Sequence, residues 1–363
     1  MDVLLMILYG IIVLGFLVFI HEGGHYLAAR AFGVRVTEFM IGLPGPNIGF
    51  TRGGTKFGLT AIPLGGYARI CGMEPGGESP HLERVLACVL RNGVVNMEDV
   101  ASELGITDDE AYDALEQLSE WGSIAGPTKK DKFNTYRAPE IKPTAKALAN
   151  GAQSYELGQP RIEADPHGFF ESERKQQYRS LPFWKRSVII LAGPVVNLLF
   201  AVVLFVVIFS VIGMDVQNTQ TGEITHMTIG PLQAIQAGFN YIGMVVSAVV
   251  GLFNPATFNA TVSQSTSVMG IAVLAKDYAD AGFVMFLQFV AMISVSLGIM
   301  NLIPIPPLDG GRFVIEVFQK ITKKLVTLRA LNYLSTVGMI LFLGLFAVMI
   351  NQDIQRFIFG NWG

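Results

Sequence analysis

The pattern of apolar residues along the chain predicts a polytopic α-helical membrane protein. Four long runs, at residues 3–20, 187–214, 283–303 and 331–350, contain no Asp, Glu, Lys or Arg. Each approaches or exceeds the length of about 20 residues that a helix needs to cross a bilayer. A fifth stretch, residues 231–253, is less apolar and predicts a helix that lies on the membrane surface or re-enters it. We therefore expect about four transmembrane helices.

Residues 36–72 have a different pattern, in which short apolar runs alternate with turn residues. The run at residues 56–62 is typical, and the prolines and glycines around it predict β-hairpins. The sequence Leu64-Gly65-Gly66-Tyr67 predicts a turn next to the membrane. Two interpretations of this β-region remain open: an edge strand that pairs with an extended peptide, or a small structural cap.

A separate soluble module is predicted at residues 79–139. Amphipathic patterns predict helices at residues 81–91 and 97–104, and a capping box that begins at Thr107 and includes Glu110 starts a third. A short strand and a hairpin follow, so the module resembles a winged-helix domain. Its hairpin carries the basic residues Lys129, Lys130, Lys132 and Arg137.

The charge of this module decides between two kinds of partner. Between residues 81 and 121 the sequence has ten acidic side chains and only two Arg or Lys residues, Arg84 and Arg91. A third helix with so many carboxylates would repel phosphates, so we expect no nucleic acid to bind. The module is better explained as a regulatory or protein-binding domain.

The composition also indicates a membrane protein, and the positions of the charged residues predict its orientation in the membrane. The chain has 363 residues, of which 51% are hydrophobic and only 15% charged, whereas about 25% of residues are charged in soluble domains. Basic residues follow the first apolar run, precede the second and follow the third. The positive-inside rule then places the N-terminus outside and these ends in the cytoplasm. The expected location is a cell membrane, and the family resemblance described below implies the bacterial inner or plasma membrane.

Four segments follow from these patterns. Residues 1–78 comprise the first transmembrane helix and the β-region, and residues 79–139 form the insert. Residues 140–186 are a linker and a juxtamembrane segment, and residues 187–363 hold the remaining transmembrane core.

The sequence His21-Glu22-Gly23-Gly24-His25 ends the first apolar run. On a helix it places two imidazoles one turn apart on the same face, where both can bind one zinc ion. The glutamate beside the first histidine can act as the base for an attacking water. Polar residues in a transmembrane segment are costly and usually functional, which favours a zinc site over a chance pair.

A third ligand is expected from Asp309, which follows a cluster of prolines after the third apolar run. Zinc hydrolases commonly use three protein ligands and keep a fourth position open. The alternative role for Asp309 is a helix N-cap. Within the second run, Gly193-Pro194-Val195-Val196-Asn197 predicts either a helix-packing kink or a polar group near the metal, and the pattern favours the kink.

Together these motifs resemble the site-2 protease family of intramembrane zinc metalloproteases, in particular the bacterial branch that cleaves membrane-bound anti-sigma factors. The resemblance implies that His21, His25 and Asp309 bind zinc and that Glu22 is the general base. It also implies a single-pass membrane protein as substrate, which is cleaved within or near its transmembrane segment. The substrate-binding residues it suggests are Gly65, Gly66, Tyr67, Asn197, Asn301 and Pro304.

The chain departs from that branch in two places. The branch usually carries PDZ domains after the second transmembrane helix, but residues 215–230 are too few for one. The branch does not usually carry the insert, so control from the cytoplasm through a protein partner is an alternative. Two other functions were considered, a non-catalytic membrane scaffold and a membrane-tethered transcription regulator. The intact Glu22 argues against the first, and the acidic third helix argues against the second.

Overall fold

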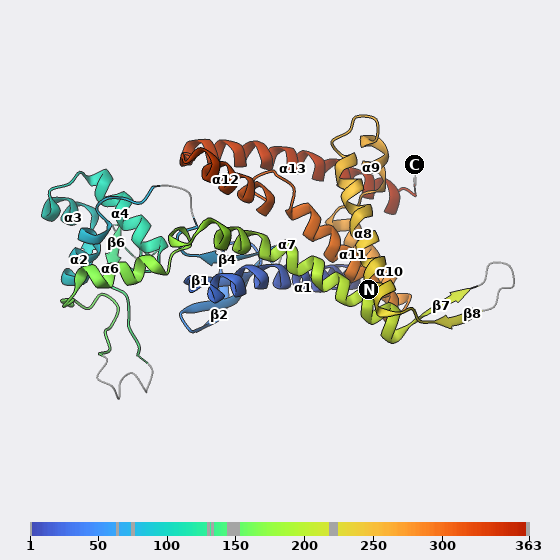
Figure 1. Ribbon diagram of the computed structural model, residues 1–363, viewed down its shortest axis with the longest axis horizontal. Coiled ribbons are helices and arrows are strands. Elements are labelled where there is room, and N and C mark those ends of the chain that lie inside the picture. The colour runs from blue at the N-terminus through green and yellow to red at the C-terminus, as the bar shows by residue number, and fades with distance from the viewer. Residues whose placement is uncertain are drawn as a thin grey trace.

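A computed structural model describes residues 2–62, 65–73, 77–128, 131, 134–143, 153–217 and 224–360. Long helices form the body of the molecule, and a small helical module lies at one end (Figure 1). The N- and C-terminal labels lie toward the other end, near the hairpin of β7 (Met214–Gln217) and β8 (Ile224–Met227).

Five of the described helices are long and apolar enough to cross a membrane. They are α1 (Asp2–Ala31), α7 (Phe183–Val206) with its π-helical extension Val207–Ile212, α8 (Pro231–Gly251), α11 (Phe283–Asn301) and α13 (Leu328–Phe357). The predicted polytopic helical fold is therefore confirmed, with one more candidate than the four runs in the sequence. The additional candidate is α8, which runs crosswise to α1 and α7 in Figure 1.

The centre of the helical body is built by α1, α7 and α11. Helix α1 packs along α7, and α7 packs against α11. Close approach is possible because Gly24 of α1 faces the backbone of Ala192 and Gly193, which leaves no room for a Cβ atom. The shorter helix α10 (Val268–Asp280) packs against α1, where Val13 and Leu17 are buried. Helix α9 (Phe258–Gln264) precedes α10 in the chain.

The β-region folds into one four-stranded sheet with the order β2-β3-β1-β4. Its strands are β1 (Val36–Ile41), β2 (Asn47–Arg52), β3 (Thr55–Thr60) and β4 (Gly66–Ile70). A predicted hairpin is present between β2 and β3, where Gly53 and Gly54 have φ of 59° and 80°. The parallel pairing of β1 with β3 was not predicted. Gly66 and Tyr67 begin β4 and are not part of a turn, while Pro63 and Leu64 lie outside the described residues.

The insert contains the three predicted helices, α2 (Leu82–Asn92), α3 (Met97–Leu104) and α4 (Asp108–Glu120). Strand β5 (Val94–Asn96) pairs antiparallel with β6 (Thr135–Arg137). The capping box is confirmed, because the Thr107 hydroxyl accepts from the Glu110 amide and the Glu110 carboxylate accepts from the Thr107 amide. The winged-helix resemblance stays a prediction, and Lys129, Lys130 and Lys132 lie outside the described residues.

The hydrophobic core of the insert extends beyond residue 139. Phe170 of α6 (Pro166–Lys175) belongs to this core and stacks on Trp121 at a ring-centroid distance of 6.1 Å. The Arg161 amide also donates to the Leu90 carbonyl at 2.7 Å. Part of the segment expected to be a linker is therefore packed into the module, because its apolar side chains complete a core that three short helices leave open.

A partly buried ion pair joins the insert to the segment between α1 and β1. The two terminal nitrogens of Arg35 each lie 2.8 Å from a carboxylate oxygen of Glu173, and the same guanidinium donates to the carbonyls of Trp121 and Gly122. The Ser123 hydroxyl also donates to Glu173 at 2.5 Å. Bidentate pairs of this kind fix orientation as well as distance. The insert is thus held against the β-region.

Candidate metal centre

The two histidines of the first helix point to the same side of α1, as their spacing predicts. Each is 6% exposed, and their Nε2 atoms lie 3.3 Å apart. Two buried imidazole nitrogens this close to each other either share a hydrogen bond or bind one metal ion between them. The pair therefore satisfies the first requirement of a metal site.

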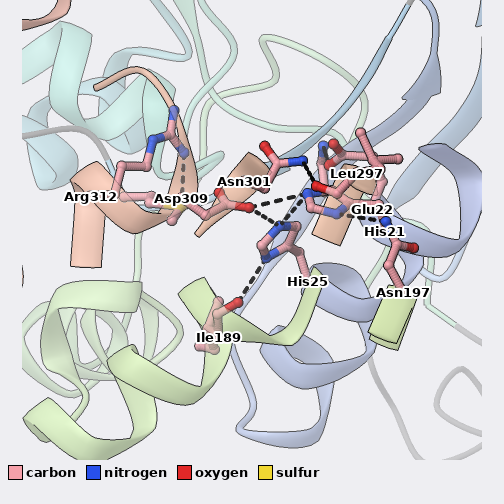
Figure 2. A network of polar contacts seen from close by, with 11 residues as sticks. His21, Glu22, His25, Ile189, Asn197, Leu297, Asn301, Asp309 and Arg312 are labelled. Carbon is pink, nitrogen blue, oxygen red and sulfur yellow. Dashed lines mark hydrogen bonds and ion pairs between the residues drawn. The ribbon is translucent and has the colours of Figure 1, made fainter. Parts of the chain in front are cut away.

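Asp309 reaches the same point from a distant part of the chain. Its Oδ2 atom lies 3.1 Å from the Nε2 of His21 and 3.2 Å from that of His25 (Figure 2). The prolines that separate α11 from α12 (Asp309–Thr322) end one helix and start the next at the histidines. The N-cap of α12 is Leu308, and it makes no side-chain cap. The Asp309 side chain is therefore directed at the imidazoles.

The three side chains offer a donor set that suits zinc. One atom from each, two imidazole nitrogens and one carboxylate oxygen, lies within 4.8 Å of the others. Two histidines and a carboxylate, with one position left for water or substrate, are a common ligand set of zinc hydrolases. The open side faces a cavity of about 260 Å³, which the three side chains line together with Glu22.

Glu22 lies beside the histidines and is held by the sheet. Its Oε2 atom accepts a hydrogen bond from the Ala68 amide of β4 at 3.0 Å. Glu22 lines the cavity together with the three candidate ligands but does not belong to their cluster. This position suits a base more than a ligand.

A backbone carbonyl orients His25. The Nδ1–H of His25 donates to the Ile189 carbonyl of α7 at 2.8 Å (Figure 2). Pro194 has no N–H group to bond the carbonyl of Ile190, the next residue, so the hydrogen bonding of α7 is weakened beside this contact. The bond to Ile189 places the proton on Nδ1 and leaves the Nε2 lone pair for a metal.

Asn197 performs the matching task for His21. It is fully buried, and its Nδ2 atom lies 3.4 Å from the Nδ1 of His21. Its Oδ1 atom has no hydrogen-bond partner in the described part of the chain. Exchanging the amide oxygen and nitrogen, which look alike in most structures, lets Oδ1 accept from an Nδ1–H of His21. This arrangement gives the buried Oδ1 atom a partner and leaves the Nε2 atom of His21 available to a metal.

Gly193 is a site residue that the sequence pattern did not reveal. A Cβ atom at this position would lie 2.3 Å from the Nε2 of His25 and 2.9 Å from the Cε1 of His21. The glycine in the Gly-Pro pair therefore makes room for both rings, in addition to any effect on helix shape. Its signal in the sequence, a glycine next to a proline in an apolar run, could not be distinguished from a packing kink.

We expect the Gly193→Ala variant to lose at least tenfold in zinc affinity and in peptide cleavage, because the methyl group displaces the ligand rings. Zinc content and cleavage of the purified variant would be measured together. Gly15→Ala in α1 is the matched control, since a Cβ atom there meets nothing within 4 Å. Equal behaviour of the two variants would contradict the assignment.

The residues predicted to bind substrate divide into two groups. Gly66, Tyr67 and Asn301 line the cavity. Gly65 lies in the exposed turn before β4, and its carbonyl accepts from the Gly42 amide. Pro304 is exposed and does not line the cavity, which Pro307 borders instead. Asn197 is behind His21 and not in the cavity, so its predicted contact with substrate is replaced by the contact with a metal ligand.

The cavity also contains residues that the sequence analysis did not select. They are Ala68 and Met73 near the sheet, and Leu308 and Arg312 around the start of α12. Arg312 donates toward the sulfur of Met73 at 3.9 Å, a weak contact (Figure 2). The sequence feature that could have identified Arg312 is its position three residues after Asp309, which places both residues on one face of α12.

Comparison with known proteins finds a peptidase family and several zinc metalloproteases. The model of peptidase family M50 matches residues 9–345. The regulator of sigma-W protease RasP of Bacillus subtilis is 23% identical, over 95% of this chain and 97% of its own. The zinc metalloprotease RasP of Geobacillus kaustophilus is 24% identical, over 96% of this chain and 97% of its own. A protein of Brucella suis is 27% identical, over 94% of this chain and 93% of its own.

Proposed function

The chain belongs to peptidase family M50, the site-2 protease family, and on this premise we propose that it hydrolyses a peptide bond within or near the transmembrane segment of a membrane protein. It is a zinc metalloprotease. The observation that supports our choice of site is the cluster of His21, His25 and Asp309 with Glu22 in the same cavity. We propose the first three as the zinc ligands.

The chemistry assigns separate tasks to the residues of the cavity. Zinc, when bound, supplies a Lewis acid that acidifies water and polarises a peptide carbonyl. Glu22 takes a proton from the attacking water and delivers it to the leaving amine. The Ala68 amide holds one oxygen of Glu22, so that the carboxylate keeps its direction through both transfers. Ile189 and Asn197 keep the imidazoles in the orientation that ligation requires.

We propose that the substrate binds as an extended strand along β4. This strand is at the edge of the sheet, and its first residues, Gly66 and Tyr67, line the cavity. An edge strand offers unpaired N–H and C=O groups to a peptide. A transmembrane helix must unwind locally before it can pair in this way, because its carbonyls are bonded within the helix. We also propose that Asn301, which lines the same cavity, binds the substrate backbone.

The protein is a multi-pass membrane protein, and its orientation is part of the proposal. Basic residues follow the first apolar run, precede the second and follow the third, which supports a cytoplasmic location for these ends and for the zinc site beside them. The N-terminus is then outside. The crosswise course of α8 supports four transmembrane helices with α8 at the outer surface (Figure 1).

We propose a single-pass membrane protein of the anti-sigma-factor type as the natural substrate. The proposal draws on the resemblance of the motifs and on the printed name of the Bacillus subtilis relative, which describes a regulator of sigma-W. The purified protein would be tested for cleavage of a single-pass model peptide. Cleavage that stops when a chelator removes zinc would support the proposed zinc-dependent hydrolysis. Retention of full cleavage after complete removal of zinc would contradict it.

The insert is proposed to bind a protein and to regulate access to the protease. Its acidic side chains favour a basic or neutral protein surface over nucleic acid. A regulatory role is favoured by its position, since Arg35 and Glu173 attach it directly to the segment between α1 and β1. Salt-sensitive binding of DNA to the purified protein would instead support the transcription-regulator alternative.

Deletion of the insert is expected to separate regulation from catalysis. The deletion should include α6, whose Phe170 would otherwise be exposed, and its ends are close because Arg174 pairs with Glu78 at 2.9 Å. We therefore replace residues 79–173 with a short Gly/Ser linker and change Arg35→Gln, which avoids an unpaired buried cation. Zinc content and cleavage of a model peptide should stay within about threefold of wild type, a change below 1 kcal/mol. Cleavage of the natural substrate in cells should change.

Arg35→Gln alone is the control for this design, because it removes the ion pair and keeps the insert. Loss of zinc and of peptide cleavage in the deletion, but not in the control, would contradict the modular interpretation.

A further inference from the structure

A second cavity lies between the start of α7 and the end of α12, apart from the metal centre. Its volume is about 250 Å³, and among the described residues it is lined by Arg186, Gln319, Lys320, Lys323, Lys324 and Leu325. Four of these six carry a positive charge and none is acidic. Like charges gathered around one space repel each other at short range, which an anion in that space would relieve.

The guanidinium of Arg186 has hydrogen-bonding capacity that its neighbours do not use. One terminal nitrogen lies 3.2 Å from the Glu316 carboxylate. The Nε atom is buried and has no hydrogen-bond partner within the described ranges. Since Arg186 lines the cavity, an acceptor bound there would give this donor the partner that it lacks. Phosphate oxygens match the fork of donors that arginine presents.

The surroundings of the cavity place it at the boundary of the bilayer. Helix α12 exposes Val314, Phe318 and Ile321, which share one face and lead to Leu325 at the cavity. On the other side, α7 begins a candidate membrane-spanning helix at Phe183, and the neighbouring Trp184 is exposed. Exposed tryptophans are enriched at the level of lipid headgroups. An apolar surface thus continues directly into a basic cavity.

We propose that this cavity binds the phosphate of an anionic phospholipid, with an acyl chain along the exposed face of α12. The basic lining selects the phosphate, and the apolar face distinguishes a lipid from a free anion. The positive-inside rule explains basic residues at this end of the protein in general. It does not explain their convergence on one cavity with a buried, unpaired Arg186 Nε.

A bound headgroup would join two helices that already touch. Arg186 belongs to α7, whereas the lysines belong to the last turn of α12 and the residues after it. The Arg186–Glu316 pair connects the same two helices, and the Tyr178 hydroxyl, from the short 3-10 helix before α7, donates a hydrogen bond to Glu316. A ligand that binds only this folded arrangement raises the thermal unfolding midpoint as its concentration increases.

The test uses the full-length protein in a neutral detergent. The probes are a short-chain phosphatidylglycerol, a phosphatidylcholine of the same chain length, and sodium phosphate. We expect phosphatidylglycerol to raise the unfolding midpoint saturably and the other two probes to have little effect. In Lys320→Gln/Lys324→Gln its apparent affinity should fall about thirtyfold, the loss expected for two lysines at a membrane surface.

The matched control is Lys175→Gln/Lys185→Gln, which removes two charges near the same end of the protein but outside the cavity lining. It should retain the wild-type affinity within about twofold, and Lys320→Arg/Lys324→Arg should do the same. An equal shift with phosphatidylcholine would overturn recognition of the phosphate. An equal shift with sodium phosphate would assign the cavity to a free anion. No saturable shift in wild type, or equal losses in both glutamine variants, would overturn the site.

Discussion

We expect the Glu22→Gln variant to bind zinc as wild type does and to cleave a model transmembrane peptide about 10²- to 10⁴-fold more slowly, the range for loss of a general base. The amide of glutamine cannot accept the proton of the attacking water. Its oxygen can still accept the hydrogen bond from the Ala68 amide, so the sheet and the cavity should keep their arrangement. The measurements are zinc content by elemental analysis and initial rates with a labelled peptide.

A matched control for this variant is Glu171→Gln, a loss of one carboxylate in α6, outside the cavity lining. It should retain zinc and wild-type rates. Loss of zinc together with activity in Glu22→Gln would show that Glu22 is a ligand and not the base.

Asp309→Ala is expected to lose both zinc and activity. The variant removes the one carboxylate whose oxygen approaches both histidine Nε2 atoms, at 3.1 and 3.2 Å. Loss of a residue that only orients a ligand lowers metal affinity about 10–100-fold, and loss of the ligand itself should exceed that range. Dialysis against a graded zinc buffer would measure the affinity, and the peptide assay would measure the activity.

The cap-only alternative for Asp309 makes a different prediction. A lost N-cap lowers the free energy of unfolding by about 1 kcal/mol without changing the metal affinity. Asp309→Asn is the informative second variant, because an amide can cap a helix nearly as well as a carboxylate but is a poor zinc ligand. Full zinc occupancy in Asp309→Asn would support the cap and remove Asp309 from the site.

Features that depend on neighbours in the chain could be predicted from the sequence alone. The two histidines share a face because the α-helix repeats every 3.6 residues, and a run of apolar residues forms that helix in any tertiary context within a bilayer. The capping box at Thr107 is equally local, since its two hydrogen bonds connect residues three positions apart. For the same reason the helices of the insert were predicted nearly to the residue.

Features that depend on packing were decided only by the tertiary structure. Asp309 was a reasonable third ligand, but its approach to His25, which is 284 residues away, depends on how α11 and α12 pack beside α1. No local pattern distinguishes a glycine that makes room for two imidazoles from a glycine that permits a kink, so Gly193 was missed.

Asn197 and Phe170 also show that roles which depend on packing could not be predicted from the sequence. Asn197 was expected to contact substrate, yet the packing of α7 on α1 places its amide behind His21. Phe170 was placed in the linker and juxtamembrane segment of residues 140–186, because a short amphipathic helix such as α6 cannot show from its own sequence which core it completes. Local hydrogen bonding and periodicity therefore determined the elements and the histidine pair, whereas contacts between elements far apart in the chain determined the complete site.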